Sequence, residues 1–405
     1  MKKILPFILL WALFSQLSTY AGGYQVRLQG QKQTGIGLIG SPFAYDASCI
    51  FYNPGGLGLI DEKFSFSAGV SGIMSNVTFQ KTGTDYQAAT DNPMGTPFYG
   101  YFSAKIGNAI SLGVGVYTPY GSSVAWDEGW AGRYLIEEIS LQAIFIQPTV
   151  SYQIGEKFGI GAGFIYAIGN VDLTRSLYYN DGSRVNLSGD ATNIGFNLGV
   201  MYRPVEGVSI GIDYRSKVVM EVKSADATFT IPPSVATQIP EKNKFDAELP
   251  LPANLDFSVA MDLNEEWTLA FELNWVMWSV YDSLSFEFEQ KGEILNSSSP
   301  RKYRNTIIPR IGAEYRLNDT FTFRGGAYYD PSPADPDYFT PETVTLNTVA
   351  FTLGASISPV KGLSIDLSIL QLIGLESEMT FTPDNFGGTY RTLTSIPGFG
   401  LTYQF

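Results

Sequence analysis

The stretch Trp267–Trp275 reads WTLAFELNW, and its alternation decides the fold. Large apolar residues occupy its odd positions, whereas Thr, Ala, Glu and Asn occupy its even positions. Successive side chains of a β-strand point to opposite faces, so one face of this segment would be apolar and the other mostly polar. The pattern predicts a strand that separates an apolar environment from a polar one.

The same period of two recurs along the rest of the chain. Residues 208–215, 309–317 and 349–358 alternate large apolar side chains with polar or small ones. Residues 158–168 alternate large side chains with small ones, mostly Gly, which would leave free space on one side. Strands with one face toward lipid and the other toward a lumen are the repeating unit of a transmembrane barrel.

The connections between these segments alternate in length. Short turns, such as residues 155–157 and 318–319, alternate with long polar loops, such as residues 175–190 and 223–250. Outer-membrane barrels have short periplasmic turns and long external loops. We therefore predict an all-β fold, a transmembrane antiparallel β-barrel of about 14 strands. The expected strands cover residues 64–80, 98–106, 109–119, 139–153, 158–174, 191–203, 207–222, 251–263, 266–289, 303–317, 320–330, 346–359, 362–381 and 391–405.

The composition agrees with this class of protein. Charged residues make up only 16% of the 405 residues, against about 25% in an average soluble domain. Aromatic residues make up 14%, and there are 42 glycines. After the N-terminus the sequence contains no apolar run of the roughly 20 residues that a membrane-spanning helix needs.

The N-terminus has the pattern of a secretion signal. Lys2 and Lys3 precede an apolar stretch at Ile4–Leu17, and small residues lead up to Ala21, so cleavage is expected before Gly22. The alternative is a membrane anchor helix, for which the apolar stretch is short. A secreted barrel belongs in the outer membrane of a Gram-negative cell, surrounded by lipid.

The C-terminus ends in an aromatic residue. Phe405 follows Phe399, Leu401 and Tyr403 on one face of the last predicted strand. A terminal aromatic residue of this kind resembles the signal that the barrel-assembly machinery recognises. The alternative is an ordinary last strand that happens to end in Phe.

The residue inventory excludes several functions. The chain has no His, which removes the commonest general base and the commonest metal ligand. Cys49 is the only cysteine, so no internal disulfide forms, and it is most simply an inert buried thiol. The net charge of −13 argues against a nucleic acid partner. We expect no enzyme activity, no metal and no cofactor.

Residues 22–62 do not alternate and are rich in Gly, Gln, Ser and Asp. Such a segment before the first strand could be a periplasmic tail or a plug inside the lumen. It contains too many apolar residues for a solvated tail, which favours the plug. The expected organisation is a signal at 1–21, a plug at 22–62 and a barrel at 63–405.

Several motifs in order along the chain resemble one known family. The chain is similar to the FadL/TodX-type outer-membrane transport proteins, which carry long-chain fatty acids or aromatic hydrocarbons. Gly55 departs from the pattern, since the family usually has Ala there, and this puts the detailed movement of the plug in doubt. The motifs are GYQ at 23–25, DAS at 46–48, FYNPGGL at 51–57, GVGVYTPYG at 113–121, WAGRY at 130–134, RIGAEY at 310–315 and RGGAYYDPSP at 324–333.

The resemblance implies a 14-stranded barrel closed by an N-terminal hatch, and a monomer. A hydrophobic ligand would pass from external loops to a pocket in the lumen and leave sideways into the membrane without an energy source. The hatch or gating residues implied are Gly22, Tyr24, Asn53, Pro54 and Gly55. The turn at Asn53 and Pro54 could move on ligand binding or could plug the barrel without moving.

Pro119, Tyr120 and Gly121 are the candidates for the lateral opening. A proline donates no hydrogen bond to a strand ladder and is confined to edges, bulges or breaks. A break in the wall of a closed barrel leaves backbone groups unsatisfied in lipid, so it requires a functional reason, such as exit of an apolar ligand. The alternative is that Pro119 simply ends the third strand.

Ligand contacts are expected at two places. Phe229 and Ile231 open an external segment with many apolar residues, which either binds the ligand or packs against neighbouring loops. Arg175 and Arg304 lie where the resemblance places basic residues near a fatty-acid head group, and an arginine suits a carboxylate. The alternative is that both arginines pair with Asp or Glu.

Three functions compete. The leading one is passive uptake of hydrophobic small molecules, with fatty acids first and aromatic hydrocarbons second. A barrel lipase or protease is disfavoured by the lack of His and of a paired-carboxylate motif. A structural or adhesive barrel would have no need of a plug, and a general porin would be blocked by one.

Overall fold

The computed structural model describes residues 23–179 and 182–405. The predicted signal peptide and Gly22 lie outside the described residues, so both remain predictions. No helix within the described residues is long and apolar enough to cross a membrane. The strands are β1 (Phe64–Ser71), β2 (Met74–Lys81), β3 (Gln87–Ala89), β4 (Phe98–Ile106), β5 (Ile110–Ala125), β6 (Glu138–Ile154), β7 (Phe158–Ser176), β8 (Arg184–Tyr202), β9 (Val208–Arg215), β10 (Val218–Thr230), β11 (Lys242–Leu251), β12 (Asn254–Asp262), β13 (Trp267–Val276), β14 (Ser283–Phe288), β15 (Ser297–Pro300), β16 (Thr306–Arg316), β17 (Phe321–Asp330), β18 (Thr348–Val360), β19 (Leu363–Phe381) and β20 (Phe386–Gln404).

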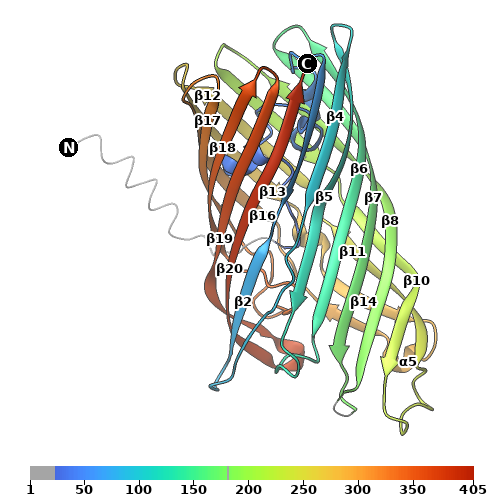
Figure 1. The fold of residues 1–405 in the computed structure, drawn as a ribbon. Coiled ribbons are helices and arrows are strands. Elements are labelled where there is room, and N and C mark those ends of the chain that lie inside the picture. The colour runs from blue at the N-terminus through green and yellow to red at the C-terminus, as the bar shows by residue number, and fades with distance from the viewer. Residues whose placement is uncertain (1–22, 180–181) are drawn as a thin grey trace.

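These segments form one closed antiparallel barrel (Figure 1). Five of the barrel strands are each built from two consecutive segments, namely β1 with β2, β9 with β10, β11 with β12, β13 with β14 and β15 with β16, and the short β3 precedes β4. Within residues 23–179 and 182–405 the barrel therefore has 14 strands, as predicted. It closes where β1 pairs with β20, for example Phe66 with Tyr403.

The alternation in the sequence corresponds to side chains that point alternately to the outer and inner faces of the barrel wall. Along β13, Trp267, Phe271 and Trp275 are exposed on the outer surface, whereas Glu272 and Asn274 are fully buried. The apolar outer face suits the hydrocarbon of the bilayer, and the polar inner face meets the contents of the lumen. The chain is thus an outer-membrane barrel protein.

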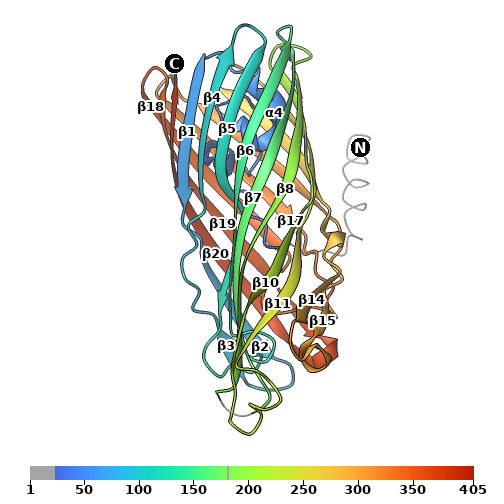
Figure 2. The ribbon, with the colours of Figure 1, turned by 90° about the vertical axis from the view of Figure 1, so that its right-hand side faces the viewer.

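Residues 23–62, called the hatch here, lie inside the barrel. Figure 2 shows the hatch helices within the lumen near the end that carries the C-terminus. Short turns join the strands at that end, which identifies it as periplasmic. Nearly all residues from Leu28 to Ile60 are buried, so the segment is a plug and not a solvated tail. The hatch helices are α2 (Gln31–Gly35), α3 (Cys49–Tyr52) and α4 (Pro54–Leu57), and outside it are α5 (Gly292–Leu295), η1 (Trp278–Val280) and η2 (Thr382–Asp384).

The predicted strands were too short at their external ends. A loop was expected at residues 223–250, but the loop in the structure covers only residues 231–241. It is shorter because β10 and β11 remain paired beyond the part of each strand that faces the membrane. Likewise β8 begins at Arg184, inside the expected loop 175–190. The outward positions there are polar, so the apolar alternation that marks a lipid-facing strand is lost although the ladder continues.

Candidate functional site

The wall of the barrel is interrupted along β5. Residues 110–117 pair with β4, but beyond Tyr117 the ladder on that side stops, because β4 begins only at Phe98. On the other side, the pairing with β6 shifts register between Tyr117 and Tyr120. Pro119 lies within this irregularity, and β5 continues to Ala125. The alternative that Pro119 merely ends the third strand is therefore wrong.

The opposite edge of this break is an irregular segment, residues 91–97. Ile73 and Gly95 exchange backbone hydrogen bonds, which hold this segment beside the first barrel strand and away from β5. Hydrogen bonding to β5 resumes at Ala125, whose carbonyl accepts from the amide of Asp91 at 2.9 Å, next to the bridge between Thr90 and Trp126. The break thus extends along β5 from about Thr118 to Val124.

The start of the hatch lies against the break. The amide of Val26 donates to the carbonyl of Pro119 at 2.8 Å, and the amide of Gly121 donates to the carbonyl of Tyr24 at 3.0 Å. Gln25 thereby forms an antiparallel bridge with Tyr120. We call residues 23–26 the strap, because they supply the backbone partners that the wall lacks at this point.

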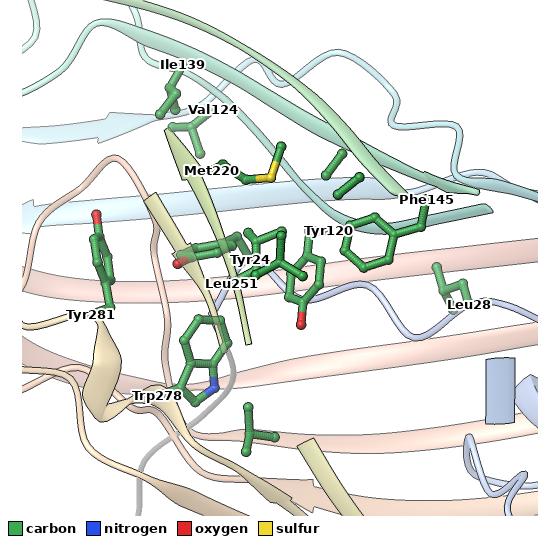
Figure 3. Close-up of a cluster of buried hydrophobic side chains, with 14 of the residues drawn as sticks. Tyr24, Leu28, Tyr120, Val124, Ile139, Phe145, Met220, Leu251, Trp278 and Tyr281 are labelled. Atoms are coloured by element: carbon green, nitrogen blue, oxygen red, sulfur yellow. The ribbon is translucent and has the colours of Figure 1, made fainter. Parts of the chain in front are cut away.

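Tyr24 holds the strap in an aromatic cluster (Figure 3). Its ring lies edge-on to Trp278 at 5.0 Å and to Tyr281 at 5.8 Å, and its hydroxyl donates to the carbonyl of Pro250 at 2.6 Å. Edge-to-face aromatic pairs of this kind contribute about 0.5–1.5 kcal/mol each beyond their buried area. The strap is therefore held both by backbone hydrogen bonds and by side-chain packing.

A cavity of about 510 Å³, called the chamber here, lies on the external side of the hatch. Its lining includes both edges of the break, residues 92–97 and residues 120–124, together with the strap. Met94 lines it and is also 60% exposed on the outer surface. The chamber therefore extends to the interruption of the wall. The other described lining residues include Leu28, Leu38, Ile308, Tyr328, Leu370, Leu372, Thr392, Thr394 and Ile396.

A second, narrower cavity of about 80 Å³ lies against β6, β7, β8, β10 and β11, and we call it the apolar groove. Tyr24, Leu141 and Thr343 line both cavities, so the groove adjoins the chamber at the strap. An apolar space next to a larger chamber suits a hydrophobic ligand. The groove is lined mainly by Ile139, Ala143, Leu173, Leu187, Ala191, Met220, Val222, Phe245, Ala247, Leu249, Leu251, Leu284 and Phe286.

Buried ion pairs attach the hatch to the wall. Arg27 donates to Asp256 at 2.7 Å and to Glu272 at 3.1 Å. Burial alone would lower the pKa of Arg27, but the two carboxylates outweigh it and raise the pKa above its ordinary value. Lys32 of the hatch lies 3.9 Å from Asp366 of β19 and also donates to Asp46 within the hatch at 2.9 Å. Burial opposes the charges of this pair, yet the pairing lowers the pKa of Asp46. Both hatch cations are thus held in the charged state.

The turn at Asn53 and Pro54 is fixed by the barrel. The side-chain amide of Asn53 donates to Ser41 in the hatch at 2.8 Å and to Val200 in β8 at 2.9 Å, and its oxygen accepts from the amide of Gly55. This cap starts α4 and at the same time joins it to the wall. Movement of this turn on ligand binding remains a prediction.

Gly55 stands where the hatch lies in close contact with the wall. A Cβ at this position would lie 2.6 Å from the carbonyl oxygen of Gly159 and 2.9 Å from that of Gly199. These are backbone atoms of β7 and β8, which cannot rotate aside. Glycine is therefore required for close approach, a reason that the sequence alone did not reveal.

We expect Gly55→Ala to destabilise the protein by about 1–3 kcal/mol, since overpacking a tight contact costs this much. The measurement is the thermal unfolding midpoint of the purified barrel in detergent. Gly100→Ala is the matched control, because a Cβ at Gly100 meets no atom within 4 Å. Equal unfolding midpoints for the two variants would show that the hatch can shift away from the wall without loss of stability.

The two predicted arginines are not brought together. Arg304 precedes β16 and pairs on the surface with Asp335. Arg175, at the end of β7, lies within electrostatic reach of Glu342 and Arg301. Neither lines the chamber or the groove in the part of the chain that the structure describes. Contact of either with a ligand head group remains a prediction.

The predicted apolar contacts lie in the external loops. Phe229 is buried at the end of β10, with its ring 5.7 Å from that of Phe288. Ile231 is partly buried against the same core. Packing against neighbouring segments is thus what the structure shows for both, and ligand contact remains a prediction.

One buried arginine was missed by the sequence analysis. Arg301 donates to Glu342 at 2.5 Å and to the hydroxyl of Tyr281 at 3.3 Å. Burial opposes its charge, but Glu342 and Tyr281 raise its pKa above the ordinary value. Glu342 and Tyr281 line the apolar groove, so this pair borders the candidate site. Nothing in the local sequence marks Arg301, because its partner is 41 residues away.

A plugged 14-stranded barrel with an apolar groove, a chamber and a broken wall defines a class of outer-membrane transport proteins. The chain belongs to the family described as outer membrane protein transport protein (OMPP1/FadL/TodX), whose model matches residues 12–405.

Relatives and solved structures agree with this assignment. Outer membrane protein P1 of Haemophilus influenzae is 25% identical, with 85% of this chain and 80% of the relative covered. The long-chain fatty acid transport protein of Salmonella typhi is 22% identical, with 91% and 92% covered. A crystal structure of a Pseudomonas aeruginosa FadL homologue has a TM-score of 0.84 at 19% identity, covering 95% of this chain and all of that one. The Ralstonia pickettii toluene transporter TbuX has a TM-score of 0.72 at 20% identity, covering 93% and 98%.

Proposed function

We propose that this protein takes up hydrophobic small molecules by diffusion, with long-chain fatty acids as the first ligand class, and releases them sideways through the break at Pro119–Gly121. The observation that carries the proposal is the lining of the chamber. It includes residues 92–97 and 120–124, on the two edges of the break, and it shares Tyr24 with the apolar groove. A ligand in the groove therefore has a short route to the membrane that passes the strap and does not cross the rest of the hatch.

The choice of fatty acids over aromatic hydrocarbons rests on the polarity of the route. The groove is apolar, but the chamber also presents Thr392 and Thr394 of β20 and Arg310 of β16. An amphiphile can satisfy such groups with its head, whereas a hydrocarbon would displace water from them without replacing its hydrogen bonds. Relatives named as fatty acid transporters and solved structures named as toluene transporters make both classes candidates.

The test is to rebuild the broken strand. We expect Pro119→Val combined with Gly121→Val to reduce uptake of radiolabelled oleate to the background of cells that lack their own fatty acid transporter, because the wall would close. Pro148→Val is the matched control, since Pro148 lies in the neighbouring strand β6 away from the break. A heat-dependent shift on gels reports that each barrel is folded.

Unchanged oleate uptake by the rebuilt strand would overturn lateral release. Uptake of toluene but not oleate by the unaltered protein would replace fatty acids with aromatic hydrocarbons as the ligand class. Uptake of neither, with the barrel folded in the membrane, would remove the transport function.

A further inference from the structure

The periplasmic end of the break is closed by a side chain. The hydroxyl of Thr118 accepts a hydrogen bond from the amide of Phe98 at 3.0 Å and donates one to the carbonyl of Phe98 at 3.3 Å. Thr118 directly follows Tyr117, the last residue of β5 before the break that pairs with β4. Opposed residues of an antiparallel ladder exchange backbone hydrogen bonds, and here a hydroxyl replaces the backbone as the partner of Phe98.

The external end of the break is closed in the same way by Asn92. Its side-chain oxygen accepts from the amide of Ala125 in β5 at 2.9 Å, and its side-chain nitrogen donates to the carbonyl of Ser75 in β2 at 3.2 Å. One side-chain amide therefore joins the strands on the two sides of the break. We call the side chains of Thr118 and Asn92 the clasps.

Between the clasps, both edges of the break are held by other parts of the wall. One edge is the lip, residues 93–97, where Gly95 exchanges backbone hydrogen bonds of 2.7 and 3.1 Å with Ile73 of the first barrel strand. The other edge, residues 120–125 of β5, is paired with β6. When the strap leaves, the opening is thus a slit whose edges are fixed and whose ends are closed.

The composition of the lip keeps the slit from closing by itself. Pro93 and Pro97 have no N–H to donate across the slit, and Gly95 directs both of its backbone groups to Ile73 on the other side. The lip therefore cannot complete a ladder with β5. The extent of the opening is left to the clasps at its two ends.

The length of such a slit controls how far it can open. Its edges are continuous chains fixed at both ends, so a longer slit opens wider in the middle for the same bending of its edges. Loss of a clasp lengthens the slit toward the next backbone pair and leaves backbone groups of Phe98 or Ala125 without the partner they have now. Open sheet edges are costly in a membrane, and the clasps avoid this cost while keeping the slit short.

We propose that Thr118 and Asn92 set the width to which the slit opens, and thereby limit the cross-section of the molecules that leave through it. The inference rests on the proposed function, lateral release through the break, and adds a size limit to it. A single alkyl chain passes the clasped slit, whereas a ligand with a bulky ring system needs the edges to separate further. Both residues determine specificity by positioning the edges of the slit.

The test compares uptake of oleate with uptake of pyrenedodecanoate, a fatty acid whose chain ends in a bulky aromatic ring system. Both are measured in cells that lack their own fatty acid transporter and express the full-length protein. In the unaltered protein we expect oleate to enter faster. Asn92→Ala should raise the ratio of pyrenedodecanoate to oleate uptake about two- to tenfold, the effect of one hydrogen bond lost from the closed ladder, and should change oleate uptake less than about twofold.

The second clasp is tested by a pair of variants. Thr118→Val keeps the shape of the side chain and removes its hydroxyl, so it should raise the same ratio. Thr118→Ser keeps the hydroxyl and should leave the ratio as in the unaltered protein.

Asn243→Ala is the matched control for Asn92→Ala. The Asn243 side chain likewise accepts from a backbone amide and donates to a backbone carbonyl, both of Gln290, but it lies in β11 and not at the break. Its removal should leave the uptake ratio unchanged, although it costs the protein the same kinds of hydrogen bond.

Three results would overturn the size limit: equally fast uptake of the two ligands by the unaltered protein, a ratio that neither Asn92→Ala nor Thr118→Val raises above that of Asn243→Ala, or a ratio that Thr118→Ser raises as much as Thr118→Val does. A heat-dependent shift on gels identifies folded barrels, and if Thr118→Val does not fold, Asn92→Ala decides. Uptake of neither ligand by the unaltered protein would instead overturn the proposed function, and the size limit with it.

Discussion

A disulfide between the strap and β5 is expected to stop oleate uptake and to restore it on reduction. The variant is Gln25→Cys with Tyr120→Cys, in a Cys49→Ala background. Gln25 and Tyr120 face each other in an antiparallel bridge, with the hydrogen bonds made by the flanking residues. Directly opposed residues of this type have Cα atoms about 4.5 Å apart, within the range that a disulfide spans.

The physical reason is that release requires the strap to leave the break. With the strap covalently attached, residues 24–26 continue to occupy the place between the chamber and the edge of β5, and the ligand has no exit. Binding of oleate should persist in the oxidised protein, because the apolar groove is not altered. The rate of uptake should fall to background, a decrease of tenfold or more (about 1.4 kcal/mol or more in the barrier).

The oxidised and reduced forms of this one variant are the comparison, so loss of the Tyr120 hydroxyl affects both equally. A second pair at the distal, periplasmic end, Ser65→Cys with Gln404→Cys, lies in the wall itself, where β1 pairs with β20, and should leave uptake independent of reductant. Uptake that is equally fast with the strap locked would show that ligands leave by another route.

The barrel was predictable because its cause is local. Alternation along segments such as Trp267–Trp275 follows from contact with lipid on one side and polar contents on the other. The external extensions of β10 and β11 were missed because their outward positions, such as Asp226 and Thr228, are polar, although inward residues such as Phe229 are apolar and buried. The alternation marks where the bilayer is, and the hydrogen-bonded strand can continue past it.

The candidate site was predictable only where the type of a single residue indicates the local structure. Pro119 signals a break by its missing N–H, and the structure places it at a register shift. The strap was not predictable in its role, because Gln25 meets Tyr120 across 95 positions of sequence. The partners of Glu272 could not be predicted either. The alternation places Glu272 on the lumen face, but it does not indicate that Arg27 and Arg310 pair with it.

Arg215→Ala is expected to destabilise the protein by about 3–5 kcal/mol and to loosen the hatch, because it removes one partner from a buried charge network. Arg215 of β9 is 3% exposed and donates to the carbonyl of Phe51 in the hatch at 2.6 Å. It also donates to the hydroxyl of Tyr117 at 2.7 Å, and its guanidinium lies over the Phe51 ring at 4.5 Å. One side chain thus connects the hatch, the strand that carries the break and strand β9.

Its removal leaves two buried groups without compensation. Asp213, 3% exposed and two residues earlier on the same face, would keep only its hydrogen bond from Asn197, and Phe51 would lose the donor to its carbonyl. A hatch that detaches opens a water-filled route through the lumen, so ion conductance across a planar bilayer should rise together with the fall in the unfolding midpoint. Arg184→Ala, an exposed position at the external end of β8, is the control and should change neither. Loss of stability without added conductance would mean that the remaining ion pairs to the wall, Arg27 with Asp256 and Lys32 with Asp366, hold the hatch by themselves.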